Sequence, residues 1–179
     1  MNVPRIVGFL ILITTLMVGI GSNLASMIDP QSLILVIGSI LGMLLLGKHN
    51  LGGMVSAVFS DSADETAVRE AIEGYKMGRY YSMAAAAVAL GLGSIVVLRN
   101  LSDPGSIGPG LAIALLSTLY ALLLGFVLFP GLQSGLEKSL PGPVPVDERL
   151  VPAALLALVF CTAMTVAVFG VLTASFTTG

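Results

Sequence analysis

Five stretches of the chain are almost wholly apolar and contain no charged residue. They cover residues 6–27, 32–47, 80–98, 107–132 and 150–176, and the weakly polar stretch 51–59 is a candidate extension of the second. A helix needs about 20 mostly apolar residues to cross the hydrocarbon core of a bilayer. The pattern therefore predicts an all-α, polytopic membrane protein with five transmembrane helices.

Basic residues fall on one side of this predicted topology. Cytoplasmic flanks of membrane helices carry an excess of lysine and arginine, and successive spans alternate sides. With the N-terminus inside, only Arg99 lies outside, so we expect an N-in, C-out protein. The basic residues that this topology places in the cytoplasm are Arg5, Lys48, Arg69, Lys76, Arg79, Lys138 and Arg149.

The same pattern divides the chain into four parts. Residues 1–47 hold the first two predicted spans, and residues 48–79 form a short cytoplasmic connector. Acidic residues open the helical pattern of this connector and basic residues close it, an order that suits the helix dipole. Its sequence leaves two interpretations open, a solvated linker and a partner-binding segment. Residues 80–138 hold the third and fourth spans, and residues 139–179 a linker and a fifth span.

Composition narrows the function. The chain is 56% hydrophobic and 10% charged, with a mean hydropathy of +1.00 and a formal net charge of −2, so it has no basic surface for nucleic acid. Cys161 and His49 are the single residues of their types, which argues against a metal site. No nucleophile, base or cofactor motif is evident, so we expect neither an enzyme nor a cofactor.

Small residues recur every three or four positions along the third and fourth spans. Such stripes let helices approach closely in lipid, so they indicate either helix packing alone or faces that line a pore or hold another helix. Gly38 and Gly42 of the second span form a further small-residue pair. The stripes are Ser82, Ala86, Ala89 and Gly93 on the third span, and Gly110, Ala114, Ser117 or Thr118, Ala121 and Gly125 on the fourth.

The predicted spans contain no aspartate, glutamate, lysine, arginine or histidine. Ion and proton pathways in membranes generally depend on such a group. If this chain takes part in ion conduction, a partner must therefore supply the carboxylate.

Two segments resemble the MotA/TolQ/ExbB family of ion-driven stator and channel subunits. Residues 98–120, LRNLSDPGSIGPGLAIALLSTLY, are similar to the loop and following helix of MotA-type subunits, and residues 26–38 to their first loop and second helix. The resemblance extends over about residues 5–47 and 80–138. Pro130 and the segment 136–138 are similar to the exit of that helix into the cytoplasm.

This resemblance implies a ring of subunits, usually five, in the bacterial inner membrane around the single transmembrane helices of a MotB-, ExbD- or TolR-like partner. The partner's aspartate carries the proton, and ring hydroxyls lie near it. Thr118 matches the hydroxyl position of the fourth helix. The implied ion pathway includes Thr118, Ser117, Ala114, Ala121, Ser82, Ala86, Ala89 and Gly93.

Departures from the family pattern keep a second hypothesis open. Met83 and Leu90 stand near positions where MotA relatives carry a proline and a threonine, and Ala121 replaces a glycine. The large cytoplasmic domain of MotA is reduced to the short connector, and the fifth span has no counterpart in the family. Leu90 favours a non-conducting, ring-shaped membrane scaffold, whereas Thr118 and the preserved loop favour a channel subunit.

Overall fold

The computed structural model describes residues 3–21, 28–60, 64–100 and 103–141, and scattered positions between 159 and 174. Every regular element among these residues is a helix, which confirms the all-α prediction for this part of the chain. The chain divides into two compact units, residues 1–30 and residues 31–179. The predicted fifth span, residues 150–176, lies outside the continuously described residues.

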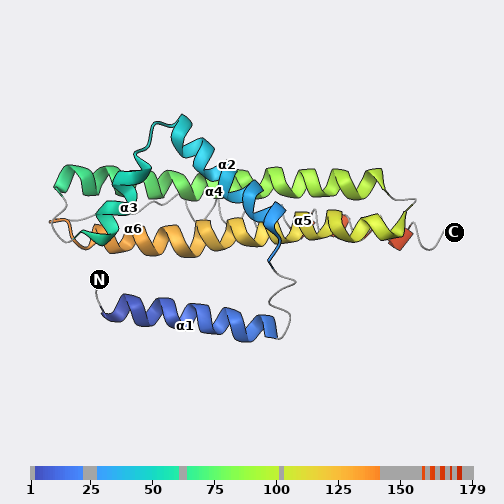
Figure 1. Cartoon of the computed structure of the whole chain (residues 1–179), viewed down its shortest axis with the longest axis horizontal. Helices are drawn as coiled ribbons and strands as arrows, with labels where there is room; N and C mark the ends of the chain where they lie inside the picture. Colours follow the sequence, from blue (N-terminus) through green and yellow to red (C-terminus); the bar gives the residue numbers. More distant parts are fainter. Residues whose placement is uncertain are drawn as a thin grey trace. The chain divides into compact units, whose positions relative to one another are not determined.

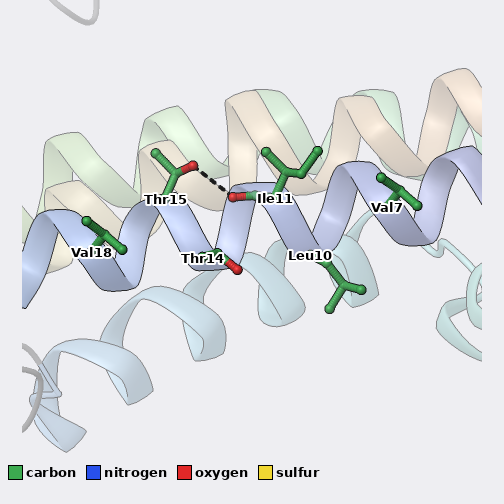
Figure 2. A pocket seen from close by; sticks show the side chains of 6 residues that line it. All are labelled: Val7, Leu10, Ile11, Thr14, Thr15 and Val18. Atoms are coloured by element: carbon green, nitrogen blue, oxygen red, sulfur yellow. Dashed lines mark hydrogen bonds between the residues drawn. The ribbon is translucent and has the colours of Figure 1, made fainter.

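The first unit contains the apolar helix α1 (Val3–Ile20). An open hollow on its surface is lined by Val7, Leu10, Ile11, Thr14, Thr15 and Val18, all from this one helix (Figure 2). The Thr15 hydroxyl donates to the carbonyl oxygen of Ile11 at 2.8 Å. This bond satisfies the hydroxyl within its own helix, as serine and threonine often do in apolar surroundings.

The second unit begins with α2 (Pro30–Leu46), which bends by 104° into the short helix α3 (Leu51–Phe59). Lys48 makes this corner with a left-handed backbone (φ 59°), and the His49 amide donates to the carbonyl oxygen of Leu44 at 3.0 Å. The Asn50 side chain then caps α3 by accepting from the Gly53 amide at 2.9 Å. Residues 51–59 therefore form a separate helix and do not prolong α2 in a straight line.

Helix α4 (Glu65–Arg99) is one continuous helix of 35 residues. It joins the helical part of the predicted connector to the predicted third span, so the boundary between residues 79 and 80 falls inside it. Near its start, the Arg69 guanidinium contacts the Glu65 carboxylate at 2.7 Å, the acid-before-base order that favours a helix.

Helix α5 (Pro104–Leu123) continues through a π-helical turn, η2 (Leu124–Leu128), into α6 (Phe129–Glu137). Together with α4 these elements form two long helical rods that lie side by side (Figure 1). Helix α5 starts at Pro104, three residues ahead of the apolar run that begins at residue 107, because proline is well suited to a first helical turn.

A hydrophobic cluster joins α2, α3, α4, the end of α5, and α6. Met54 of α3 packs on Gly74 of α4, where an added Cβ would come within 2.5 Å of the methionine sulfur. The Tyr75 hydroxyl donates to the Met54 carbonyl oxygen at 2.9 Å. The buried members are Val36, Ile40, Leu44, Met54, Ala57, Val68, Ala71, Tyr75, Ala85, Ala86, Ala121 and Leu136. The predicted connector is thus packed against its neighbours.

Two helices in the described part of the chain are long and apolar enough to cross a membrane, Glu65–Arg99 and the continuous rod Ile107–Glu137. The bent pair Pro30–Leu46 and Leu51–Phe59 would add a third if it formed one span. The structure therefore supports a helical membrane protein with two or three candidate spans in its described residues, whereas five spans and their orientation remain predictions.

Candidate functional site

Small residues bring α4 and α5 into direct backbone contact. A Cβ added to Gly93 would lie 2.6 Å from both the Cβ and the backbone nitrogen of Ala114. One added to Gly110 would lie 3.1 Å from the backbone nitrogen of Val97. The stripes predicted on the two helices therefore face each other inside one subunit, which is the close approach that small residues permit.

One antiparallel register relates the close contacts that glycines make between the two rods. Gly125 packs on Ser82, and the Phe129 ring lies over Gly78, in the same register that pairs Gly93 with Ala114. Continuing this register along the helices places Thr118 level with Ala89 and Ser117 level with Leu90.

The hydroxyls along this interface differ in how they are satisfied. Thr118 is 7% exposed, and its hydroxyl donates to the Ala114 carbonyl oxygen at 2.8 Å. The fully buried Ser82 does the same to the Gly78 carbonyl oxygen at 2.8 Å. Ser117 is also fully buried, yet its Oγ has no hydrogen-bond partner among the described residues. An unsatisfied buried hydroxyl costs free energy, and Ser117 differs in this respect from Ser82 and Thr118.

All eight residues predicted to line an ion pathway are buried within the subunit. Ala86, Ala89, Ala114 and Ala121 are at most 2% exposed, and Gly93 is buried against Ala114. The geometry of one subunit accounts for these residues as packing between α4 and α5. That these residues also line a pore is a proposal about the ring of several subunits.

Another face of α4 is open in the described structure. Ala84, Ala87, Val88 and Leu92 are exposed, and a Cβ added to Gly91 would meet nothing within 4 Å. This face carries small residues at helical spacing, and its side chains are exposed among the described residues of the second unit. It was not singled out from the sequence, because spacing alone does not say which of two small faces packs internally.

A buried polar chain connects α4 to α6. Arg79 is 5% exposed, and its Nη1 donates to Oε1 of Gln133 at 2.8 Å. Gln133, 8% exposed, in turn donates from Nε2 to Oε1 of Glu137 at 2.7 Å. A buried guanidinium is tolerated only where hydrogen bonds or charges hold it.

Sequence reasoning missed this chain. It used Arg79 as a marker of the cytoplasmic side and as a basic residue at the end of the connector helix, and it did not single out Gln133. The available signal was a glutamine three residues after Pro130 and four residues before Glu137, the spacing at which helix side chains meet.

The π-helical turn has a local cause. Pro130 has no amide hydrogen to give to the carbonyl four residues before it, and a regular α-helix would bring its ring against that carbonyl. The helix widens just ahead of the proline, where the Phe129 amide donates to the carbonyl oxygen of Leu124, five residues back. Such π turns are often found at functional sites.

The fold and this interface define a helical membrane protein whose two long rods pack through small residues. Comparison with known proteins finds partial matches to MotA-type proteins. The chain is 44% identical over 60 residues to motility protein A of Cereibacter sphaeroides, a match that covers 34% of this chain and 24% of that protein. It is 54% identical over 48 residues to motility protein A of Aquifex aeolicus, covering 27% and 19% of the two chains.

A third relative is an uncharacterized protein of Bacillus subtilis, YtxD, which is 37% identical over 60 residues, or 34% of this chain and 22% of the relative. No family model and no solved structure matches the chain. The matches confirm the predicted resemblance to MotA-type proteins, and each spans less than a quarter of the relative's length.

Proposed function

We propose that this chain is a ring-forming subunit of an ion-driven channel or motor complex of the MotA/ExbB type in the bacterial inner membrane. The observation that carries the proposal is the α4–α5 pair. Its small-residue interface holds the hydroxyls of Ser117 and Thr118, and no aspartate, glutamate, lysine, arginine or histidine lies between residues 80 and 98 or between residues 107 and 132. The similarity to motility protein A supports the same conclusion.

In this proposal the carboxylate that binds the proton or sodium ion comes from a single-span partner of the MotB, ExbD or TolR kind. A charged group in the membrane needs a polar neighbour or water, and the ring hydroxyls provide one. The exposed small face of α4, around Ala87 and Gly91, offers a surface for a neighbouring subunit or the partner helix. We propose a homo-pentamer surrounded by lipid, with α4 and α5 innermost.

Native mass spectrometry in mild detergent tests the assembly. We expect five copies of this chain, together with the partner when a single-span protein carrying an intramembrane aspartate is encoded beside it and co-expressed. Reconstituted vesicles should then conduct protons or sodium ions only when both proteins are present. A monomer under several detergents would contradict the proposed ring. A pentamer that never conducts with such a partner would contradict the channel hypothesis and favour a non-conducting scaffold.

We propose five spans with the N-terminus inside and the C-terminus outside, because this topology places all basic residues except Arg99 in the cytoplasm. Single cysteines at Ser62 and Thr178, in a Cys161→Ala background, are expected to react with a membrane-impermeant maleimide from opposite sides. If both cysteines were labelled from the same side, an even number of spans would separate residues 62 and 178, and the five-span topology would be wrong.

A further inference from the structure

The π-helical turn sets the rotational position of α6. A π turn takes about one residue more than an α turn, and one residue corresponds to about 100° around a helix. Every side chain after residue 128 is therefore rotated by about 100° around the helix axis relative to its position in a regular α-helix. If the wide turn were lost, the place of Gln133 opposite Arg79 would pass to Leu132.

Two contacts between α4 and α6 depend on this rotational position. The first is the Arg79–Gln133 hydrogen bond of 2.8 Å, which continues to Glu137. The second is the Phe129 ring, which would lie 3.1 Å from a Cβ added to Gly78, with its centroid 6.0 Å from that of Tyr75. Both would be lost on a 100° rotation, because leucine cannot accept from a guanidinium and Phe129 would leave the gap at Gly78.

We propose that Arg79 and Gln133 form a latch that holds α6 in the rotational position set by the π turn. Opening the latch lets α6 turn or swing as a unit about residues 124–130, while the small-residue contacts between α4 and α5 stay closed. Arg79 is then a positioning residue that acts at the end of the rod, beside the point where Gly125 of the π turn packs on Ser82 of α4. The inference does not depend on ion conduction.

Cysteine reactivity of the full chain in detergent tests the latch and requires neither a partner nor ion flux. In a Cys161→Ala background, a single cysteine at Leu136, which is buried, reports on the docking of α6. A single cysteine at Ser82, also buried and nearly the same shape as serine, reports on the contact between α4 and Gly125 of the π turn. Each reporter is labelled with a small maleimide in the parent and in four variants: Arg79→Met, Gln133→Leu, Pro130→Ala, and Gln133→Glu combined with Glu137→Gln.

We expect Arg79→Met and Gln133→Leu to raise the labelling rate at position 136 by on the order of tenfold to a hundredfold, the range for losing one hydrogen bond to a charged group. The Ser82 reporter should stay protected in both. Gln133→Glu combined with Glu137→Gln keeps an acceptor for Arg79 without facing two carboxylates on each other, because Gln133 donates to Glu137 in the parent, and should label close to the parent rate. Pro130→Ala, which permits a regular α-helix without touching the latch, should also expose position 136.

Three results would overturn the latch. Unchanged labelling at position 136 in Arg79→Met would show that the bond does not hold α6. Equal acceleration at positions 82 and 136 would show that Arg79 supports the whole bundle and not the docking of α6 in particular. Fast labelling in the double variant Gln133→Glu, Glu137→Gln would show that the contact depends on packing and not on the acceptor.

Discussion

Replacing Gly93 with alanine is expected to destabilise the folded subunit by about 3 kcal/mol, the upper part of the range for forcing an extra methyl group into a packed interface. The new Cβ would lie 2.6 Å from the backbone nitrogen of Ala114 and 2.8 Å from its Cα. Backbone atoms cannot move aside as a flexible side chain can, so α4 and α5 must separate. Thermal unfolding in detergent, followed by circular dichroism, measures the loss.

Gly91 provides the matched control on the same helix. A Cβ added there would meet nothing within 4 Å, so Gly91→Ala should be neutral or stabilise the subunit by up to about 1 kcal/mol through helix propensity. Equal destabilisation by the two variants would mean that helical glycine itself, and not the α4–α5 contact, determines the effect. If Gly91→Ala left the subunit stable but abolished the oligomer, the open face of α4 would be identified as a contact between subunits.

Ion flux through the proposed complex is expected to fall by about 3- to 30-fold in Thr118→Val, while the ring still assembles. Valine keeps the shape of threonine and removes the hydroxyl. An interhelical hydrogen bond in a membrane is worth roughly 0.6 to 2 kcal/mol, which corresponds to that range of rates. Proton or sodium uptake by vesicles containing the chain and its carboxylate-bearing partner measures the effect.

Ser117 is the control for this experiment. Its hydroxyl is fully buried without a partner among the described residues, so Ser117→Ala should leave flux nearly unchanged and should not weaken the subunit. Unchanged flux in Thr118→Val would mean that its hydroxyl serves only its own helix through the 2.8 Å bond to Ala114. If Ser117→Ala lowered ion flux more than Thr118→Val, the proposed ion pathway would have to pass Ser117 and Leu90 instead of Thr118.

The sequence was sufficient to predict the apolar helices and the small-residue stripes, because both depend on local periodicity. It could not decide between packing and pore for residues such as Ala89 and Ala114, since a small residue favours close approach to any helix. The structure shows that Ala114 packs on Gly93 and that Ala89 is buried within the same subunit. Whether such residues also line a pore depends on how several subunits assemble, and the sequence of one chain does not determine that arrangement.

Other features depended on distant pairs of residues and were not predictable from local patterns. Arg79 and Gln133 are 54 positions apart, and their bond requires the α4–α6 packing that the π turn produces. The corner at Lys48 places a non-glycine residue in a left-handed conformation, which sequence propensity disfavours. The change of direction between residues 47 and 51 was therefore missed, although the short helix itself lies in a stretch already noted as apolar.

The unbroken course of α4 limits how this chain can be recombined with its relatives. Thirty-five residues at about 1.5 Å each make a strut of roughly 50 Å without an internal joint. A cytoplasmic module grafted between residues 79 and 80 would cut this strut, whereas one inserted ahead of Glu65 would leave it whole. Interchangeable cytoplasmic parts, whether exchanged by evolution or by engineering, are therefore best accommodated between α3 and α4.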